Sequence, residues 1–140
     1  SADLQTELPQ AGIALGIQQT ARDPDVYRCL VIHAGPIPHN EGTWITIDDC
    51  EIRRNNIRRW QLNGLERFAL QQVDEDVPGP VNLEIEVDAE KITSLKFHGQ
   101  PLVNGMDQLK TVRIPNHSKA GIVVLGHVVF QSILCEEFAR

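Results

Sequence analysis

The most constraining pattern in this sequence is the strict alternation of apolar and polar side chains over residues 81–87. Valine, leucine, isoleucine and valine occupy every second position, and asparagine and two glutamates lie between them. Because successive side chains of a β-strand point to opposite faces, the pattern predicts a strand with one face buried and one face in water. Strands of this kind are typical of antiparallel sheets.

Short strand-like runs separated by turn residues continue along most of the chain. Residues 91–97 follow a short turn at residues 88–90 and complete a predicted hairpin with residues 81–87. Further strands are expected at residues 12–18, 26–33, 43–48, 108–114 and 121–130. The last of these runs is apolar on both faces, which is typical of a central strand.

Proline, glycine and aspartate mark the connections between these runs. Asp23, Pro24 and Asp25 predict a turn, because proline fixes φ and aspartate accepts hydrogen bonds from its own neighbouring backbone. Two prolines and two glycines in residues 34–42 predict a loop, and residues 74–80 predict an acidic connection.

Two segments have the apolar spacing of a short helix instead, with apolar residues at i, i+3, i+4 and i+8. They are Leu65, Phe68, Ala69 and Val73 in the first segment, and Phe130, Ile133, Leu134 and Phe138 in the second. The sequence therefore predicts a mainly β fold, an antiparallel sandwich or barrel of about seven or eight strands with one or two short helices.

The length of 140 residues fits one domain. We expect residues 1–10 to form a loose N-terminal arm and residues 11–140 to form a single β-rich domain.

A hydrophobic content of 41% with 23% charged residues is typical of a soluble globular protein. No apolar run approaches the roughly 20 residues of a spanning helix, so membrane insertion is not expected. A formal net charge of -6 argues against general binding to nucleic acid.

Cys29, Cys50 and Cys135 are an odd number of widely spaced cysteines without a CxxC pair. A secreted disulfide scaffold would favour an even number, so the sequence predicts free or buried thiols in a reducing compartment such as the cytoplasm. Acidic residues flank Cys50 and follow Cys135, and nearby negative charge raises the pKa of a thiol. Neither cysteine is therefore expected to be an activated nucleophile.

The strongest local concentration of positive charge is a segment with four arginines in seven residues. It contains Arg53, Arg54, Arg58 and Arg59 and is followed by Trp60. Guanidinium groups bind carboxylates and phosphates bidentately, and an aromatic ring beside them can stack on a ligand or a partner side chain. These five residues are the candidate contact with a ligand or partner.

A two-residue turn at Asn55 and Asn56 would place Arg53 opposite Arg58 at the tip of a hairpin. Directly opposed arginines repel each other unless an anion lies between them, so this geometry favours a bound ligand. The alternative is that the arginines pair with the acidic residues at positions 48, 49 and 51. From residue 48 to residue 60 the formal net charge is only +1, which fits a structural role.

His33, His39 and Glu41 are weak metal candidates around the predicted loop. Imidazole and carboxylate groups can bind a transition metal. Their spacing matches no catalytic metal motif, however, and the number of ligands stops at three. No metal is therefore favoured, and a satisfied, partly buried side chain is the alternative for His33.

The sequence contains no nucleophile elbow, no phosphate-binding loop and no dinucleotide motif. It therefore predicts a non-enzymatic binding or assembly module without a cofactor, acting through contacts with a protein partner or with copies of itself. One alternative is a metal-dependent or sugar-modifying β-fold enzyme that uses His33, His39 and Glu41. Another is nucleic-acid or phosphate-ligand binding through residues 53–60.

Overall fold

The computed structural model describes residues 10–37, 39–54, 60–73, 82–102, 111–115 and 118–125, and these residues contain strands and no helix. The longer strands are β1 (Gln10–Gln19), β2 (Val26–Ile37), β3 (Asn40–Arg54) and β4 (Trp60–Val73). The shorter strands are β5 (Leu83–Asp88), β6 (Lys91–Phe97), β7 (Gln100–Pro101) and β8 (Lys119–Leu125).

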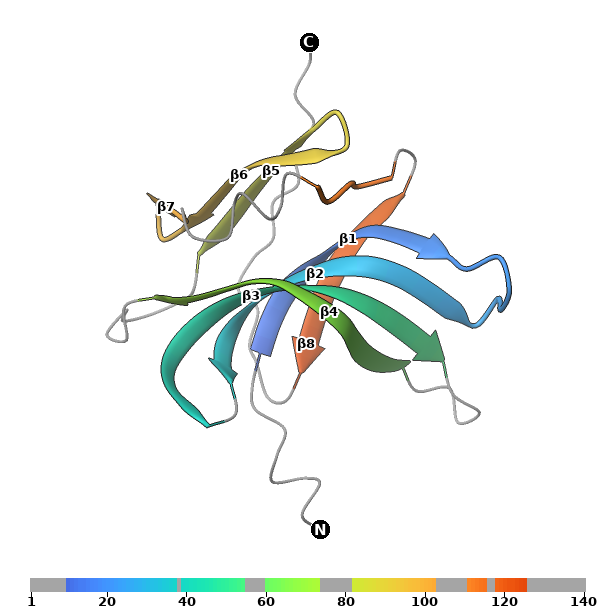
Figure 1. Cartoon of the computed structure of the whole chain (residues 1–140), viewed down its shortest axis with the longest axis horizontal. Coiled ribbons are helices and arrows are strands. Elements are labelled where there is room, and N and C mark those ends of the chain that lie inside the picture. The colour runs from blue at the N-terminus through green and yellow to red at the C-terminus, as the bar shows by residue number, and fades with distance from the viewer. Residues whose placement is uncertain are drawn as a thin grey trace.

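The strands form two antiparallel sheets, which Figure 1 shows as two layers. The larger sheet has the order β4-β3-β2-β1-β8, and the smaller sheet has the order β5-β6-β7. Consecutive strands β1 to β4 are neighbours, so the larger sheet is a meander to which β8 is added beside β1. The prediction of a mainly β, antiparallel, sandwich-like fold is confirmed.

The main core lies between the two sheets. The larger sheet contributes Leu30, Ile32, Ala34, Ile45 and Ile47, and the smaller sheet contributes Ile92, Leu95 and Phe97. Within β2 and β3 these residues are spaced by two positions, as expected for side chains that share one face. In β6 a register shift against β5 lengthens the step from Ile92 to Leu95 to three positions. Burial of each aliphatic side chain stabilises the fold by about 1.5–3 kcal/mol.

The opposite face of the larger sheet, called the far face below, is lined by smaller and more polar side chains. Ala14, Cys29, Val31 and Cys50 form an apolar cluster there, and none of them is more than 4% exposed. Strand β2 is consequently buried on both faces, which is typical of a central strand.

The smaller sheet is built from two tight turns with positive φ. Ala89 and Glu90 have φ values of 47° and 68° and join β5 to β6, while His98 and Gly99, at 50° and 77°, join β6 to β7. Two consecutive positive φ angles in a two-residue loop match the twist of the flanking strands. The turn at Glu90 also supports residues 111–115, because the Ile114 N–H donates to the Glu90 carbonyl at 2.7 Å.

The predicted helix over residues 65–73 is wrong, because these residues belong to β4. Two β-bulges explain the misleading spacing. Arg67 and Ala69 pair with adjacent residues of β3, so Phe68 between them is an extra residue. In the same way, Leu65 is an extra residue between Gly64 and Glu66. Each extra residue shifts the inward-facing positions by one, so the apolar residues no longer alternate. The helix predicted over residues 130–138 lies outside the described residues.

Two further expectations need correction. Residues 34–37 continue β2 rather than form a loop, because the ladder shifts between Gly35 and Ile37 and accommodates Pro36 at a bulge. Residues 111–114 are not a strand, since Ile114 instead bonds to the β5–β6 turn. Within the described part of the chain, β8 pairs with β1, and residues 126–130 of the predicted central strand lie outside the described residues.

Candidate functional site

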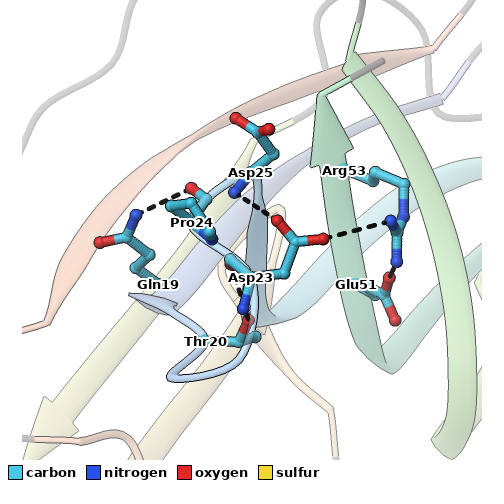
Figure 2. Close-up of polar contacts among 7 residues, drawn as sticks. All are labelled: Gln19, Thr20, Asp23, Pro24, Asp25, Glu51 and Arg53. Carbon is cyan, nitrogen blue, oxygen red and sulfur yellow. Dashed lines mark hydrogen bonds and ion pairs between the residues drawn. The ribbon is translucent and has the colours of Figure 1, made fainter. Parts of the chain in front are cut away.

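Arg53 of the arginine-rich segment lies at the end of β3 and is paired with two acids. Its guanidinium donates to Glu51 Oε1 at 3.0 Å and lies 3.6 Å from Asp23 Oδ2 (Figure 2). The Arg53 side chain is about half exposed. For this arginine the structure supports pairing with acidic neighbours, which was the structural alternative.

The β1–β2 turn places Asp23 against Arg53. Within the turn the Thr20 hydroxyl donates to the Asp23 carbonyl at 2.9 Å, and the Asp25 N–H donates to the Asp23 carboxylate at 3.0 Å (Figure 2). The Arg54 N–H then donates to the Asp25 carbonyl at 3.0 Å, which joins the turn to the end of β3. The turn predicted at residues 23–25 is therefore confirmed.

The two-residue hairpin at Asn55 and Asn56 is wrong. Arg54 pairs with Trp60 and Arg53 pairs with Gln61, so five residues separate the last paired positions instead of two. Arg53 consequently has Gln61 opposite it and not Arg58. Arg58 and Arg59 lie outside the described residues.

A cluster of three polar side chains, two of them buried, spans three strands on the far face. His33 on β2, Asp48 on β3 and Arg67 on β4 form this group, called the His33 cluster below. The His33 Nε2 lies 2.9 Å from Asp48 Oδ2, and Arg67 donates through Nε to Oδ1 at 2.9 Å and through a terminal nitrogen to Oδ2 at 3.3 Å. Asp48 is directly opposite Arg67 in the β3–β4 ladder and diagonal to His33, which pairs with Thr46.

The electrostatics of the cluster keep Asp48 ionised. Burial raises the pKa of its carboxyl group, but hydrogen bonds from His33 and Arg67 together with the Arg67 charge outweigh burial, and the pKa lies below its ordinary value of 3.8. The same contact raises the pKa of Arg67. The side chains of His33 and Asp48 are only 9% and 8% exposed, whereas that of Arg67 is 47% exposed.

The His33 cluster has the composition of an acid–base site without its geometry. The neighbouring Thr46 hydroxyl is buried and has no hydrogen-bond partner among the described residues, so it does not contact the imidazole as a nucleophile would. The contacts of the cluster tie strands β2, β3 and β4 together. The alternation of Thr46, Asp48 and Cys50 was the signal in the sequence that puts these residues on one face.

His33, His39 and Glu41 are not brought together. His39 occupies the β2–β3 turn with a φ of 64°, while His33 bonds to Asp48. Within the described ranges, no three histidine, cysteine, aspartate or glutamate side chains form a group that could hold a metal ion. His33 is a hydrogen-bonded structural side chain as in the alternative, and at 7% exposure it is more deeply buried than expected.

The described thiols are poor nucleophiles. Burial, and then the negative charge of Asp49, raise the pKa of Cys29 to about 11. Burial also raises the pKa of Cys50 to about 12, with smaller contributions from Cys29, Asp48 and Asp49. The direction predicted for Cys50 from its acidic neighbours is therefore confirmed, although burial is the larger cause.

A cleft of about 300 Å³ opens between the larger sheet and residues 111–115. Leu15, Phe68 and Val112 form part of its apolar wall, and Arg28 and Asp49 line it as an ion pair. Arg113 also lines the cleft, so its charged residues are two arginines and one aspartate.

The edges of the larger sheet carry exposed aliphatic side chains that sequence reasoning missed. Leu65 on β4 is 49% exposed and Ile122 on β8 is 43% exposed. A Cβ atom added to Gly64 would meet no heavy atom within 4 Å, so the backbone of β4 is open at this point. Among the described residues, β4 pairs with β3 alone and β8 with β1 alone.

Comparison of the chain with protein-family models, with characterised proteins and with solved structures found no match. Within the described part of the chain, no helix has the length and apolar character needed to cross a membrane.

Proposed function

We propose that this protein is a non-enzymatic binding or assembly module that acts through protein–protein contacts at the β4 edge of the larger sheet. The observation that carries the proposal is a 14-residue strand that pairs with β3 alone among the described residues and has an exposed leucine and an open glycine. An edge strand presents unpaired N–H and C=O groups, to which a strand of another chain can add.

The composition of β4 favours this contact. The strand contains no lysine and no proline, which are the residues that most often protect an edge from strand addition. The Arg67 guanidinium is held by Asp48. The two bulges limit regular pairing to the parts of β4 on either side of them, and Trp60–Gly64 is one such part.

The arginine-rich segment leads directly into this part of β4. Guanidinium groups bind carboxylates bidentately, so a segment with four arginines directly before β4 favours a partner that carries carboxylates. This arrangement gives the cationic segment a role in choosing the partner, and the edge of β4 supplies the backbone contact.

The occupant that fits best is a second copy of the chain. Every neighbouring pair in the larger sheet is antiparallel, so β4 and β8 run in the same direction. Pairing β4 with β8 of another copy side by side would be parallel, whereas pairing β4 with β4 across a two-fold axis is antiparallel and closes the assembly. We therefore expect a symmetric dimer with one continuous sheet.

Light scattering of the purified protein tests the proposal. We expect a mass of twice 15.7 kDa over a concentration series. Leu65→Lys should reduce the mass to that of a monomer, because it places a charge and its mirror copy next to the Trp60–Gly64 part at which the two strands would pair. Val87→Lys is the matched control, since Val87 is 42% exposed on β5 and should leave the dimer intact.

Three results would contradict the proposal. They are a wild-type monomer at all concentrations with no co-purifying protein, a dimer that persists in folded Leu65→Lys, and equal loss of the dimer in folded Val87→Lys. Circular dichroism of each variant establishes that it is folded. A larger complex with a different protein, lost in Leu65→Lys alone, would support the β4 contact with another partner.

A further inference from the structure

Cys29 and Cys50 face each other across neighbouring strands. They are direct Cα partners in the β2–β3 ladder. Directly opposed residues of antiparallel strands have Cα atoms about 4.5 or 5.5 Å apart, depending on the hydrogen-bonding position, and both values fall within the range of roughly 4.4–6.8 Å found in disulfides. The backbone therefore already has the spacing that a disulfide needs.

The two side chains also share one environment. Both belong to the apolar cluster on the far face, and they are 4% and 1% exposed. Both are free thiols, and they are close enough that Cys29 contributes to the raised pKa of Cys50. The Cys50 thiol donates to the Asp48 carbonyl at 3.6 Å, which connects this pair to the His33 cluster.

We propose that Cys29 and Cys50 form a reversible cross-strand disulfide. The oxidant is a small-molecule disulfide such as oxidised glutathione. One cysteine thiolate attacks it, forming a mixed disulfide and releasing one molecule of reduced glutathione as thiolate. The second cysteine thiolate then attacks the mixed disulfide and releases the other molecule. Two protein thiols lose two electrons and two protons, and the oxidant is reduced to two thiols.

Burial controls when this reaction occurs. With a pKa of about 11, the Cys29 thiol is ionised in only about one molecule in a thousand at about pH 8, and the sulfur is shielded from solvent. Exchange in the native state should therefore be slow and should require opening of β2 from β3. During folding both thiols are exposed, and the ladder then brings them together.

Oxidation also changes a contact inside the sheet. The Cys50 sulfur loses its hydrogen and can no longer donate to the Asp48 carbonyl. The bond closes a loop of about 20 residues that contains the β2–β3 turn, and closing such a loop restricts the unfolded chain. The oxidised protein should consequently resist urea better than the reduced protein.

Refolding from urea in a buffer of oxidised and reduced glutathione tests the proposal. The protein carries Cys135→Ser so that only the two facing thiols remain, and the wild type is treated in parallel. Residues 29–53 contain no lysine or arginine before Arg53, so both cysteines fall in one tryptic peptide, while Cys135 falls in another. Samples are alkylated under denaturing conditions before digestion, and the peptide mass is measured.

We expect the residue 29–53 peptide to lose two hydrogen atoms and to take up no alkylating agent, and dithiothreitol should restore two alkylated cysteines. The oxidised protein should have a higher urea midpoint than the reduced protein, and this shift should be absent in Cys50→Ser, which cannot close the bond. In the native reduced protein, reaction with a thiol reagent should be at least about 100-fold slower than in urea.

A folded product in which both cysteines remain alkylated, or in which each carries glutathione, would overturn the proposal. An intramolecular disulfide that forms only in protein lacking the native circular dichroism spectrum would do the same. If Cys135→Ser does not fold, the wild-type peptide map decides the outcome, because the third cysteine is in a separate peptide.

Discussion

Replacing Asp48 with asparagine tests whether the His33 cluster stabilises the sheet. The substitution keeps the size of the side chain but removes the negative charge that accepts hydrogen bonds from His33 and Arg67. Removing one partner of a buried ion pair destabilises a protein by about 3–5 kcal/mol. The Arg67 side chain is 47% exposed and can turn to water, so we expect a loss of about 2–3 kcal/mol for Asp48→Asn.

The effect of Asp48→Asn should depend on pH in a defined direction. The folded pKa of Asp48 lies below its ordinary value of 3.8, so between the two pKa values the unfolded state binds more protons than the folded state. The stabilisation is therefore fully present above about pH 4–5 and is lost as the pH falls through the folded pKa. The difference between wild type and variant should shrink over the same interval.

Urea unfolding followed by tryptophan fluorescence measures this difference at neutral and acidic pH. Asp49→Asn is the matched control, because Asp49 pairs with Arg28 and their side chains are 26% and 50% exposed. That pair is worth only about 0–1 kcal/mol. The reasoning is refuted if Asp48→Asn costs no more than the control at neutral pH, or if its cost stays constant into acid.

Two further substitutions test backbone geometry. Glu90→Gly should raise stability by about 0.5–1 kcal/mol in thermal unfolding, because Glu90 has a φ of 68° that glycine adopts without strain; a lower melting temperature would contradict this. Gly12→Ala should cost at least about 2 kcal/mol in urea unfolding, because the new Cβ would overlap the Ile32 carbonyl and the His33 Cβ. Gly64→Ala, where the added Cβ meets nothing, should change stability much less, and equal losses at both glycines would disprove the argument.

The parts of the fold that follow regular alternation were predictable from the sequence. The hairpin of β5 and β6 appears where apolar and polar residues alternate, and β2 appears where β-branched residues gather. Strand β4 was not predictable in this way, because its bulges at Leu65 and Phe68 replace the period of two by the spacing of a helix. Bulges depend on how two strands align, and a single strand's sequence does not show the alignment.

For the candidate sites too, contacts within one strand were predictable, and contacts that depend on strand register were not. Pairing of Arg53 with Glu51 was foreseeable, since they are two residues apart on one strand and share a face. The contact of Asp48 with Arg67 depends on the β3–β4 register and joins residues 19 positions apart. Whether Cys29 faces Cys50 likewise depends on the β2–β3 register. The sequence therefore shows that the two cysteines are present, but it does not show that they are neighbours.

The position of Asp48 has a consequence for how the larger sheet chooses its alignment. If β3 slipped by one residue against its neighbours, Asp48 would enter the core that Ile47 now occupies, because a one-residue slip exchanges the two faces of a strand. A carboxylate buried there without Arg67 would cost several kcal/mol. Strand β4 has no uniform alternation of its own to resist such slippage, so the Asp48 carboxylate on β3 disfavours the misaligned ladders that the bulges of β4 would otherwise tolerate.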